Sequence, residues 1–200
     1  PAHEHVHAWA GGSGTGPETL DHNRYLLNAP EPAILDAGAV DLAADYLMAG
    51  HSLGEHKILT PHAGELERFL RRIHEHSPQR WEEMLDGALV PSREDINAEP
   101  FRWVRAACEL SGATVMLKGS TTLIAAPVGA TYSVHGATGW LATAGSGDTL
   151  TGILGALLAQ YMAAAQERHE QVEGCTYASI AALAVYLHNR AALASLEGRK

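Results

Sequence analysis

The chain has 200 residues, of which 46% are hydrophobic, and it carries a formal net charge of −9 at pH 7. That length suits one domain over residues 1–200 with a sizeable core. The acidic balance excludes the basic surface that nucleic-acid binding requires. The most apolar runs, 150–165 and 178–187, are shorter than the roughly 20 residues that cross a bilayer. We therefore expect no membrane span and a small-molecule partner.

The first pattern is a short strand over residues 6–10 that leads into a glycine-rich loop. Glycine permits backbone shapes that other residues avoid, so such a loop can face a ligand or serve as a flexible tether. The strand before it and the helix after it favour the ligand. His3, His5 and His7 alternate on one face of this strand, but no carboxylate or cysteine cluster accompanies them, so we expect no metal site there.

Strand and helix patterns then alternate along the chain. Strands are predicted over residues 32–36, 57–59 and 114–117, and helices over 17–28, 39–48, 66–70 and 101–110. This order indicates βαβ units, and therefore an α/β fold with a parallel sheet and helices packed on its faces. Residues 74–99 show no long periodicity, and prolines interrupt them, so we predict a surface insertion there.

The second half adds a hairpin and two apolar helices. Residues 122–126 and 131–135 flank Pro-Val-Gly-Ala, which is typical of a hairpin. The helices are expected from near Gly147 and over residues 177–196. Cys108 and Cys175 each lie in an apolar helical pattern, so we predict buried free thiols in a reducing cytoplasm.

The glycine turn over residues 142–148 comes directly before the first of these helices. Its glycines let the backbone approach a phosphate closely, and the free N–H groups of the helix start favour negative charge. Asp148 stands at this position. It is either a helix cap, the commonest role for Asp at a helix start, or a base placed where a phosphoryl group arrives. The turn alone does not decide between the two.

Polar clusters follow several predicted strands, and in open parallel sheets ligands bind beyond the carboxyl ends of the strands. These clusters are residues 12–16, Asp36, residues 60–65 and residues 118–122. The chain has no Gly-x-x-x-x-Gly-Lys-Ser/Thr motif and no Gly-x-Gly-x-x-Gly after a first strand, so neither a P-loop nor a standard dinucleotide fold fits.

Three motifs stand in order: Thr-Pro-His-Ala-Gly-Glu at 60–65, Lys-Gly-Ser-Thr-Thr at 118–122 and Ala-Thr-Ala-Gly-Ser-Gly-Asp at 142–148. Together they resemble the ADP-dependent NAD(P)H-hydrate dehydratases of the ribokinase-like superfamily. The resemblance implies a three-layer α/β/α fold with a mostly parallel central sheet, here without the family's N-terminal βα units. The chain has Asp-Ala-Gly-Ala-Val at 36–40, where the family tends to carry a second carboxylate.

The resemblance also implies an activity, the ADP-driven dehydration of hydrated NADH or NADPH with release of AMP and phosphate. Asp148 would be the catalytic base and would bind the hydrate together with Gly14, Gly16 and His62. The nucleotide would be held by Lys118, Gly119, Ser120, Thr121, Thr122, Gly145, Ser146 and Gly147. We expect ADP as co-substrate, Mg²⁺ with it, no metal-ligating side chains, and a cytoplasmic homo-oligomer.

Each of these roles has a simpler alternative. His62 could only cap the following helix, Lys118 could be an ordinary surface residue, and Asp36 could be a solvent-exposed loop carboxylate. Two other functions also stay open: a kinase of the same superfamily acting on a vitamin precursor or sugar, and a nucleotide-binding module without turnover. The motif at residues 60–62 argues against the kinase.

Overall fold

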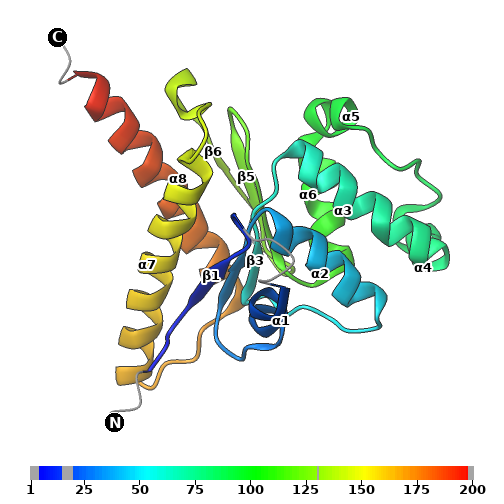
Figure 1. Cartoon of the computed structure of the whole chain (residues 1–200), viewed down its shortest axis with the longest axis horizontal. Coiled ribbons are helices and arrows are strands. Elements are labelled where there is room, and N and C mark those ends of the chain that lie inside the picture. The colour runs from blue at the N-terminus through cyan, green and yellow to red at the C-terminus, as the bar shows by residue number, and fades with distance from the viewer. Residues whose placement is uncertain (1–4, 15–19, 130, 198–200) are drawn as a thin grey trace.

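The computed structural model describes residues 5–14, 20–129 and 131–197. Six strands form one sheet in chain order, from β1 to β6 (Figure 1). Their bounds are β1 Trp9–Gly11, β2 Ala33–Leu35, β3 Lys57–Leu59, β4 Thr114–Leu117, β5 Thr122–Ala125 and β6 Thr131–Val134. Strands β1 to β4 pair in parallel, whereas β4, β5 and β6 form an antiparallel meander. The mostly parallel α/β fold and the hairpin are confirmed.

Helices cover both faces of the sheet (Figure 1). They are α1 Leu20–Asn28, α2 Gly38–Met48, α3 Ala63–His76, α4 Pro78–Leu85, α5 Arg93–Ala98, α6 Pro100–Ser111, α7 Ser146–Glu167 and α8 Gly174–Glu197, with a short 3₁₀ turn, η2, over Gly139–Leu141. Successive strand residues point to opposite faces. In β2, the fully buried Leu35 belongs to the core cluster on the side of α1 to α6, whereas the fully buried Ile34 belongs to the cluster on the side of α7 and α8.

Two local expectations need correction. The first strand begins at Trp9 and not at residue 6, because its partner β2 offers only three residues for pairing, starting opposite Trp9. The segment 74–99 contains helices α4 and α5, and it buries Trp81 and Ile96 in the core. Its prolines do not disrupt structure, because Pro78 stands at a helix start, where the missing N–H costs nothing. Whether this segment is an insertion within the family stays a prediction.

The two cysteines are both unpaired, as predicted, but they differ in burial. Cys108 lies in the core, and its burial raises the pKa of the thiol to about 12. Cys175 is only half-buried, so the prediction of burial is wrong there. It stands in the first turn of α8, beside Glu173, where the helix emerges from its loop.

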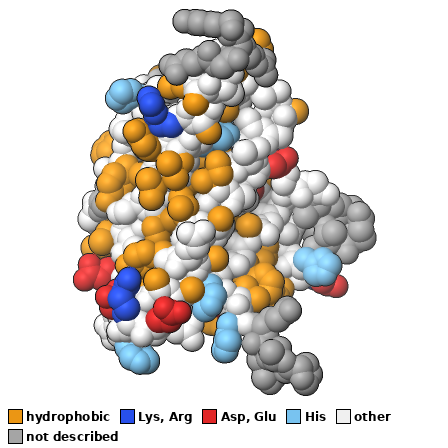
Figure 2. All heavy atoms as spheres, turned by 90° about the vertical axis from the view of Figure 1, so that its left-hand side faces the viewer, with side chains coloured by type: hydrophobic (Ala, Val, Ile, Leu, Met, Phe, Trp, Pro, Cys, Tyr) orange, Lys and Arg blue, Asp and Glu red, His pale blue; other side chains and the backbone are white. Residues whose placement is uncertain are grey.

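The outer surface of α7 and α8 carries many hydrophobic side chains (Figure 2). Leu183, Tyr186 and Leu187 of α8 are exposed there, and their spacing places them on one helix face. No helix in the described part of the chain combines the length and apolarity needed to cross a membrane. The apolar surface therefore belongs to two helices whose opposite sides bury the sheet.

Candidate nucleotide site at the carboxyl end of the sheet

The first and second sequence motifs meet beyond the ends of β3 and β4. The parallel pairing continues past both strands as a bridge between His62 and Lys118. The backbone N–H of Lys118 donates to the carbonyl of Pro61 at 2.8 Å. This bridge places the residue before α3 beside the first residue after β4, although 56 positions separate them along the chain (118 minus 62).

His62 caps helix α3. Its Nδ1 accepts hydrogen bonds from the backbone N–H groups of Gly64, at 3.1 Å, and Glu65, at 3.2 Å. Glu65 returns the interaction, because its carboxylate accepts from the backbone N–H of His62 at 2.8 Å. This reciprocal pair is a capping box, so the capping role is confirmed. More than half of the His62 side chain is exposed, and it also lines the pocket described below.

Asp36 is the polar centre of this end of the sheet. It is 3% exposed, and its Oδ1 lies 2.6 Å from the Nζ of Lys118. The hydroxyls of Thr60, at 2.8 Å, and Thr151, at 3.3 Å, donate to the same carboxylate. Burial opposes ionisation of Asp36, but Lys118 and the donated hydrogen bonds outweigh it and hold the pKa of the carboxyl below its usual value. The alternative that Asp36 is only an exposed loop carboxylate is therefore wrong.

This cluster ties the site together mechanically. Asp36 follows β2, Thr60 follows β3, Lys118 follows β4, and Thr151 belongs to the second turn of α7. One buried carboxylate therefore fixes three strand ends and the helix that follows the glycine turn. The ammonium group of Lys118 is only partly exposed, so its position is set by these partners and not by solvent.

The glycine turn begins helix α7 and faces Lys118. Gly145 is the N-cap residue, with a φ of 87° that favours glycine. A Cβ added to Gly147 would lie 3.7 Å from the Nζ of Lys118, so the free N–H groups of the helix start and this ammonium group share one space. Helix and lysine together create positive potential there.

Asp148 is the third residue of α7, and the N-cap position belongs to Gly145. The Asp148 side chain is exposed and accepts a short hydrogen bond from the hydroxyl of Ser13. This contact brings the glycine-rich loop after β1 to the start of α7. Gly14 is the next residue in that loop, with a φ of 64° and an exposed position. Gly16 lies outside the described residues.

A pocket of about 630 Å³ opens at this end of the sheet. Seven of the predicted residues line it, namely His62, Lys118, Gly119, Ser120, Thr122, Ser146 and Gly147. The described residues that line it include two permanent cations, Arg93 and Lys118, but no aspartate or glutamate. In a chain with a net charge of −9, such a lining favours an anionic ligand. Thr121, Gly145 and Asp148 are close in sequence but are not among the lining residues.

Sequence reasoning missed the residues that α5 and α8 bring to this pocket. Arg93 is the first residue of α5, and His188 and Asn189 belong to α8. A signal for the α8 pair was present, because His-Asn interrupts an alanine-rich apolar helix. Polar residues on such a helix are usually solvent-facing, but these two are buried.

Metal binding by side chains alone finds no support in the described part of the chain, where no group of three or more His, Cys, Asp or Glu side chains could hold an ion. The carboxylate of Asp36 is already bound by Lys118 and two threonines. Magnesium, however, is commonly held by one or two carboxylates together with substrate phosphates. Asp148, beside the anion-favouring helix start, is a donor of the right chemistry for that arrangement.

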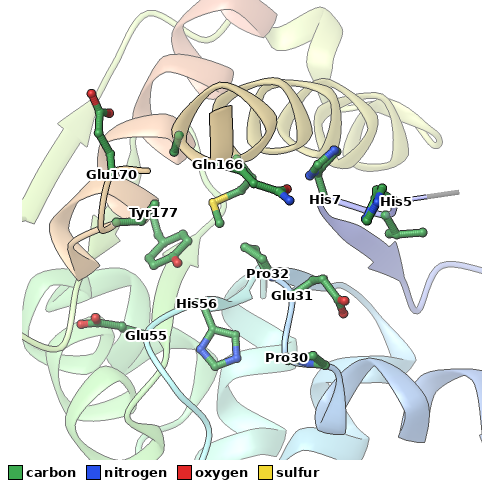
Figure 3. Close-up of a pocket in the computed structure, with 14 residues that line it drawn as sticks. His5, His7, Pro30, Glu31, Pro32, Glu55, His56, Gln166, Glu170 and Tyr177 are labelled. Carbon is green, nitrogen blue, oxygen red and sulfur yellow. The ribbon is translucent and has the colours of Figure 1, made fainter. Parts of the chain in front are cut away.

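A second pocket, of about 580 Å³, lies at the opposite end of the sheet (Figure 3). Its walls come from the segments before β1, β2 and β3 and from the connection between α7 and α8. Histidines and glutamates surround it, including His56, Glu31 and Glu55. None of the residues predicted from the three motifs contributes to it.

Comparison with known proteins places these observations in a family. Residues 1–198 match a carbohydrate-kinase family model described as NAD(P)H-hydrate dehydratase. The chain belongs to this family. A bifunctional NAD(P)H-hydrate repair enzyme of Mycobacterium tuberculosis is 36% identical over 158 residues, which cover 77% of this chain and 28% of the relative. An ADP-dependent (S)-NAD(P)H-hydrate dehydratase of Neisseria meningitidis is 35% identical over 161 residues, which cover 78% of this chain and 48% of the relative.

A solved structure agrees with the fold. The ADP/ATP-dependent NAD(P)H-hydrate dehydratase of Bacillus subtilis, crystallised with ATP and Mg²⁺, superposes with a TM-score of 0.67 at 25% identity. The match covers 98% of this chain but 59% of that protein. The ribokinase-like fold and the family are therefore established, while the chain spans less than two thirds of the length of these relatives.

Proposed function

We propose that the protein carrying this chain dehydrates hydrated NADH or NADPH at the expense of ADP, which becomes AMP and phosphate. The observation that supports this proposal best is the meeting of three family motifs around Lys118, at a pocket whose described lining carries cations and no carboxylates. ADP, sometimes with ATP, is named for family members that resemble this chain.

Lys118 and the start of α7 would hold the phosphates. The ammonium group and the free N–H groups face one space, and they would stabilise the charge that grows on the transferred phosphoryl group. Ser120, Thr121, Thr122 and Gly119 would surround the rest of the nucleotide, together with Gly145 and Ser146. Magnesium would neutralise phosphate charge when bound, held chiefly by the phosphate oxygens and water.

Asp148 would be the general base. It would accept the proton of the hydroxyl on the hydrated ring as that oxygen attacks the terminal phosphorus of ADP, and AMP would leave. Loss of phosphate from the ring and of a proton from the neighbouring carbon would then restore the ring double bond. Ser13 and Gly14 would help to place the substrate, since the hydroxyl of Ser13 donates to Asp148. Gly16 and His62 would complete the part of the site that binds the hydrated nicotinamide ring.

The substitution Asp148→Asn tests the proposal. Asparagine keeps the size of the side chain but cannot take the proton, so recovery of NADH absorbance from hydrated NADH and ADP should slow by about 10² to 10⁴-fold. Affinity for ADP should be kept or improved, because a negative charge leaves the phosphate site. The full-length protein should be used, with melting measured for wild type and variant in the same buffer.

Three results would contradict the proposal or a part of it. Repair at a near-normal rate by Asp148→Asn would mean that Asp148 is not the general base. Phosphorylation of a stable small molecule from ATP, without recovery of NADH, would favour the kinase. If the full-length wild type bound ADP but showed no turnover, the protein would be a nucleotide-binding module and not an enzyme. The cytoplasmic homo-oligomer stays a prediction, which light scattering and fractionation would test.

A further inference from the structure

His188 is a buried polar side chain in a wall of the nucleotide pocket. It lies in α8, one helical turn after Val185, and only 8% of it is exposed. Both residues line the pocket that Lys118 and Gly147 line from the other elements. Leu141 and Leu150 also line it and add apolar surface. Phosphate binding by Lys118 and the start of α7 gives no role to His188, which reaches the pocket from α8.

The imidazole of His188 makes no hydrogen bond or ion pair with any residue in the described part of the chain. Its neighbour Asn189, by contrast, donates to the carbonyl of His135 at 3.4 Å. Among the described residues, only Trp103 has a fully buried side-chain polar atom without a hydrogen-bond partner. Because the ring nitrogens of His188 also lack a partner, they are not fully buried. His188 therefore offers its hydrogen-bonding capacity to the pocket.

Burial also determines what this group can offer. It lowers the pKa of His188, so the ring is neutral near pH 7. A neutral imidazole has one N–H donor and one bare nitrogen that accepts. That combination does not suit a phosphate, which only accepts, as well as it suits an adenine edge, which presents both an amino donor and ring-nitrogen acceptors. The apolar side chains nearby suit the faces of a flat base.

We propose that His188 recognises the adenine base of the nucleotide whose phosphates lie at Lys118. This inference rests on the proposed function and adds the residue that selects the base. A buried group that is left without its partner costs free energy, so His188 would penalise nucleotides whose base cannot satisfy it. Selection of the base would then come from α8, and attraction of the phosphates from the ends of β4 and α7.

The test compares ADP with UDP, because both carry the same diphosphate and ribose. Uracil has its own donor and acceptors but is one ring smaller, so from the same ribose position its edge falls short of a group placed to meet adenine. Calorimetry on the full-length protein should show a preference of wild type for ADP. His188→Leu should lower the affinity for ADP by about tenfold and leave that for UDP nearly unchanged, because leucine fills the space without hydrogen bonds. His188→Gln, which keeps a donor and an acceptor, should retain part of the preference. His76→Leu, an exposed histidine outside the pocket, is the matched control.

The possible outcomes separate the two proposals. Equal losses for ADP and UDP in His188→Leu, or a lower melting temperature for this variant only, would give His188 a structural role and overturn the inference. A wild type without preference for ADP, or a variant that keeps it, would also overturn the inference while nucleotide binding stands. Failure of wild type to bind either nucleotide would overturn the proposed function and the inference with it.

Discussion

The two ends of the sheet each carry a pocket and a lysine, but they hold the lysine differently. At the carboxyl end, Lys118 lies against the carboxylate of Asp36. At the amino end, Lys57 is 2% exposed, and its Nζ donates to the backbone carbonyls of Ala29 and, at 3.1 Å, Glu31. Burial lowers the pKa of Lys57 to about 8, with a smaller opposing effect from the charge of Glu31.

This difference indicates a ligand-binding role for Lys118 and a structural role for Lys57. The ion pair at the carboxyl end fixes the position of Lys118 beside a pocket without acidic lining residues in the described part, an arrangement that favours an anionic ligand. The lysine at the amino end satisfies carbonyls between α1 and β2, and it is not among the residues that line the pocket nearby. We therefore expect substitutions at the carboxyl end to have the larger effects.

Gly12→Ala should have the largest effect on stability. Gly12 follows β1 with a φ of 115°, and a Cβ there would lie only 1.8 Å from the backbone carbonyl oxygen of Asp36. The added strain and the displaced backbone should lower the free energy of unfolding by about 4 kcal/mol. Urea denaturation of both proteins measures this cost, and a loss below about 1 kcal/mol would show that the two loops are not packed as described.

The close packing of Gly12 against Asp36 is also an example of a long-range contact that the sequence patterns did not predict. Hydrophobic periodicity predicted the strands at 32–36, 57–59 and 114–117, because a buried parallel strand needs a short apolar run wherever it lies. The pairing of Asp36 with Lys118 joins residues 82 positions apart, and no local pattern specifies such a partner. The sequence placed both residues at strand ends, but it left open whether Asp36 belongs to the site or is an exposed loop carboxylate.

The roles of side chains on helices were harder still to predict. His62 followed a local rule, since a capping residue and Glu65 three positions later form a capping box, and this alternative was correctly kept. His188 had no such rule. Periodicity says that a helix has a buried face, but not that a polar residue on it borders a pocket formed by elements from other parts of the chain.

Asp36→Asn should have the second-largest effect. It removes the nearer of the two carboxylates beside Lys118 and leaves a partly buried ammonium group with only Glu65, at 3.9 Å, so we expect a loss of about 3 kcal/mol near pH 7. Because the folded-state pKa of Asp36 is lowered, its contribution is complete above the unfolded-state pKa and is lost as pH falls through the folded-state pKa. The difference between the two proteins should therefore shrink on acidification. Glu31→Gln, the matched change at the amino end, should cost less than about 1 kcal/mol.

Lys57→Met tests the amino end through pH. The folded-state pKa of Lys57 is about 8 and its ordinary value 10.5, so between these values the unfolded chain binds a proton that the folded chain does not. The free energy of unfolding of the wild type should consequently rise with pH in this window. Below about pH 8 the folded state bears the full cost of burying a charged Lys57. Relative to Lys57→Met, the gain should be about 2 kcal/mol between pH 8 and 10.5. A difference that does not change with pH would mean that Lys57 is not desolvated.

Gly174→Ala should have the smallest effect and gives the direct contrast to Gly12. Gly174 begins α8 at the amino end, and a Cβ there would meet Oε2 of Glu55 at 1.8 Å, the same separation as at Gly12. The obstacle is now the end of a flexible side chain instead of a backbone carbonyl, and Gly174 does not require a positive φ. Rotation of Glu55 should relieve the overlap, while alanine improves the helix, so the net change should stay within about 1 kcal/mol. Urea denaturation beside Gly12→Ala measures the contrast, with Glu55→Gln as a control for any lost charge at the helix start. A loss as large as that at Gly12 would mean that Glu55 is fixed, and the amino end would then be as rigidly built as the carboxyl end.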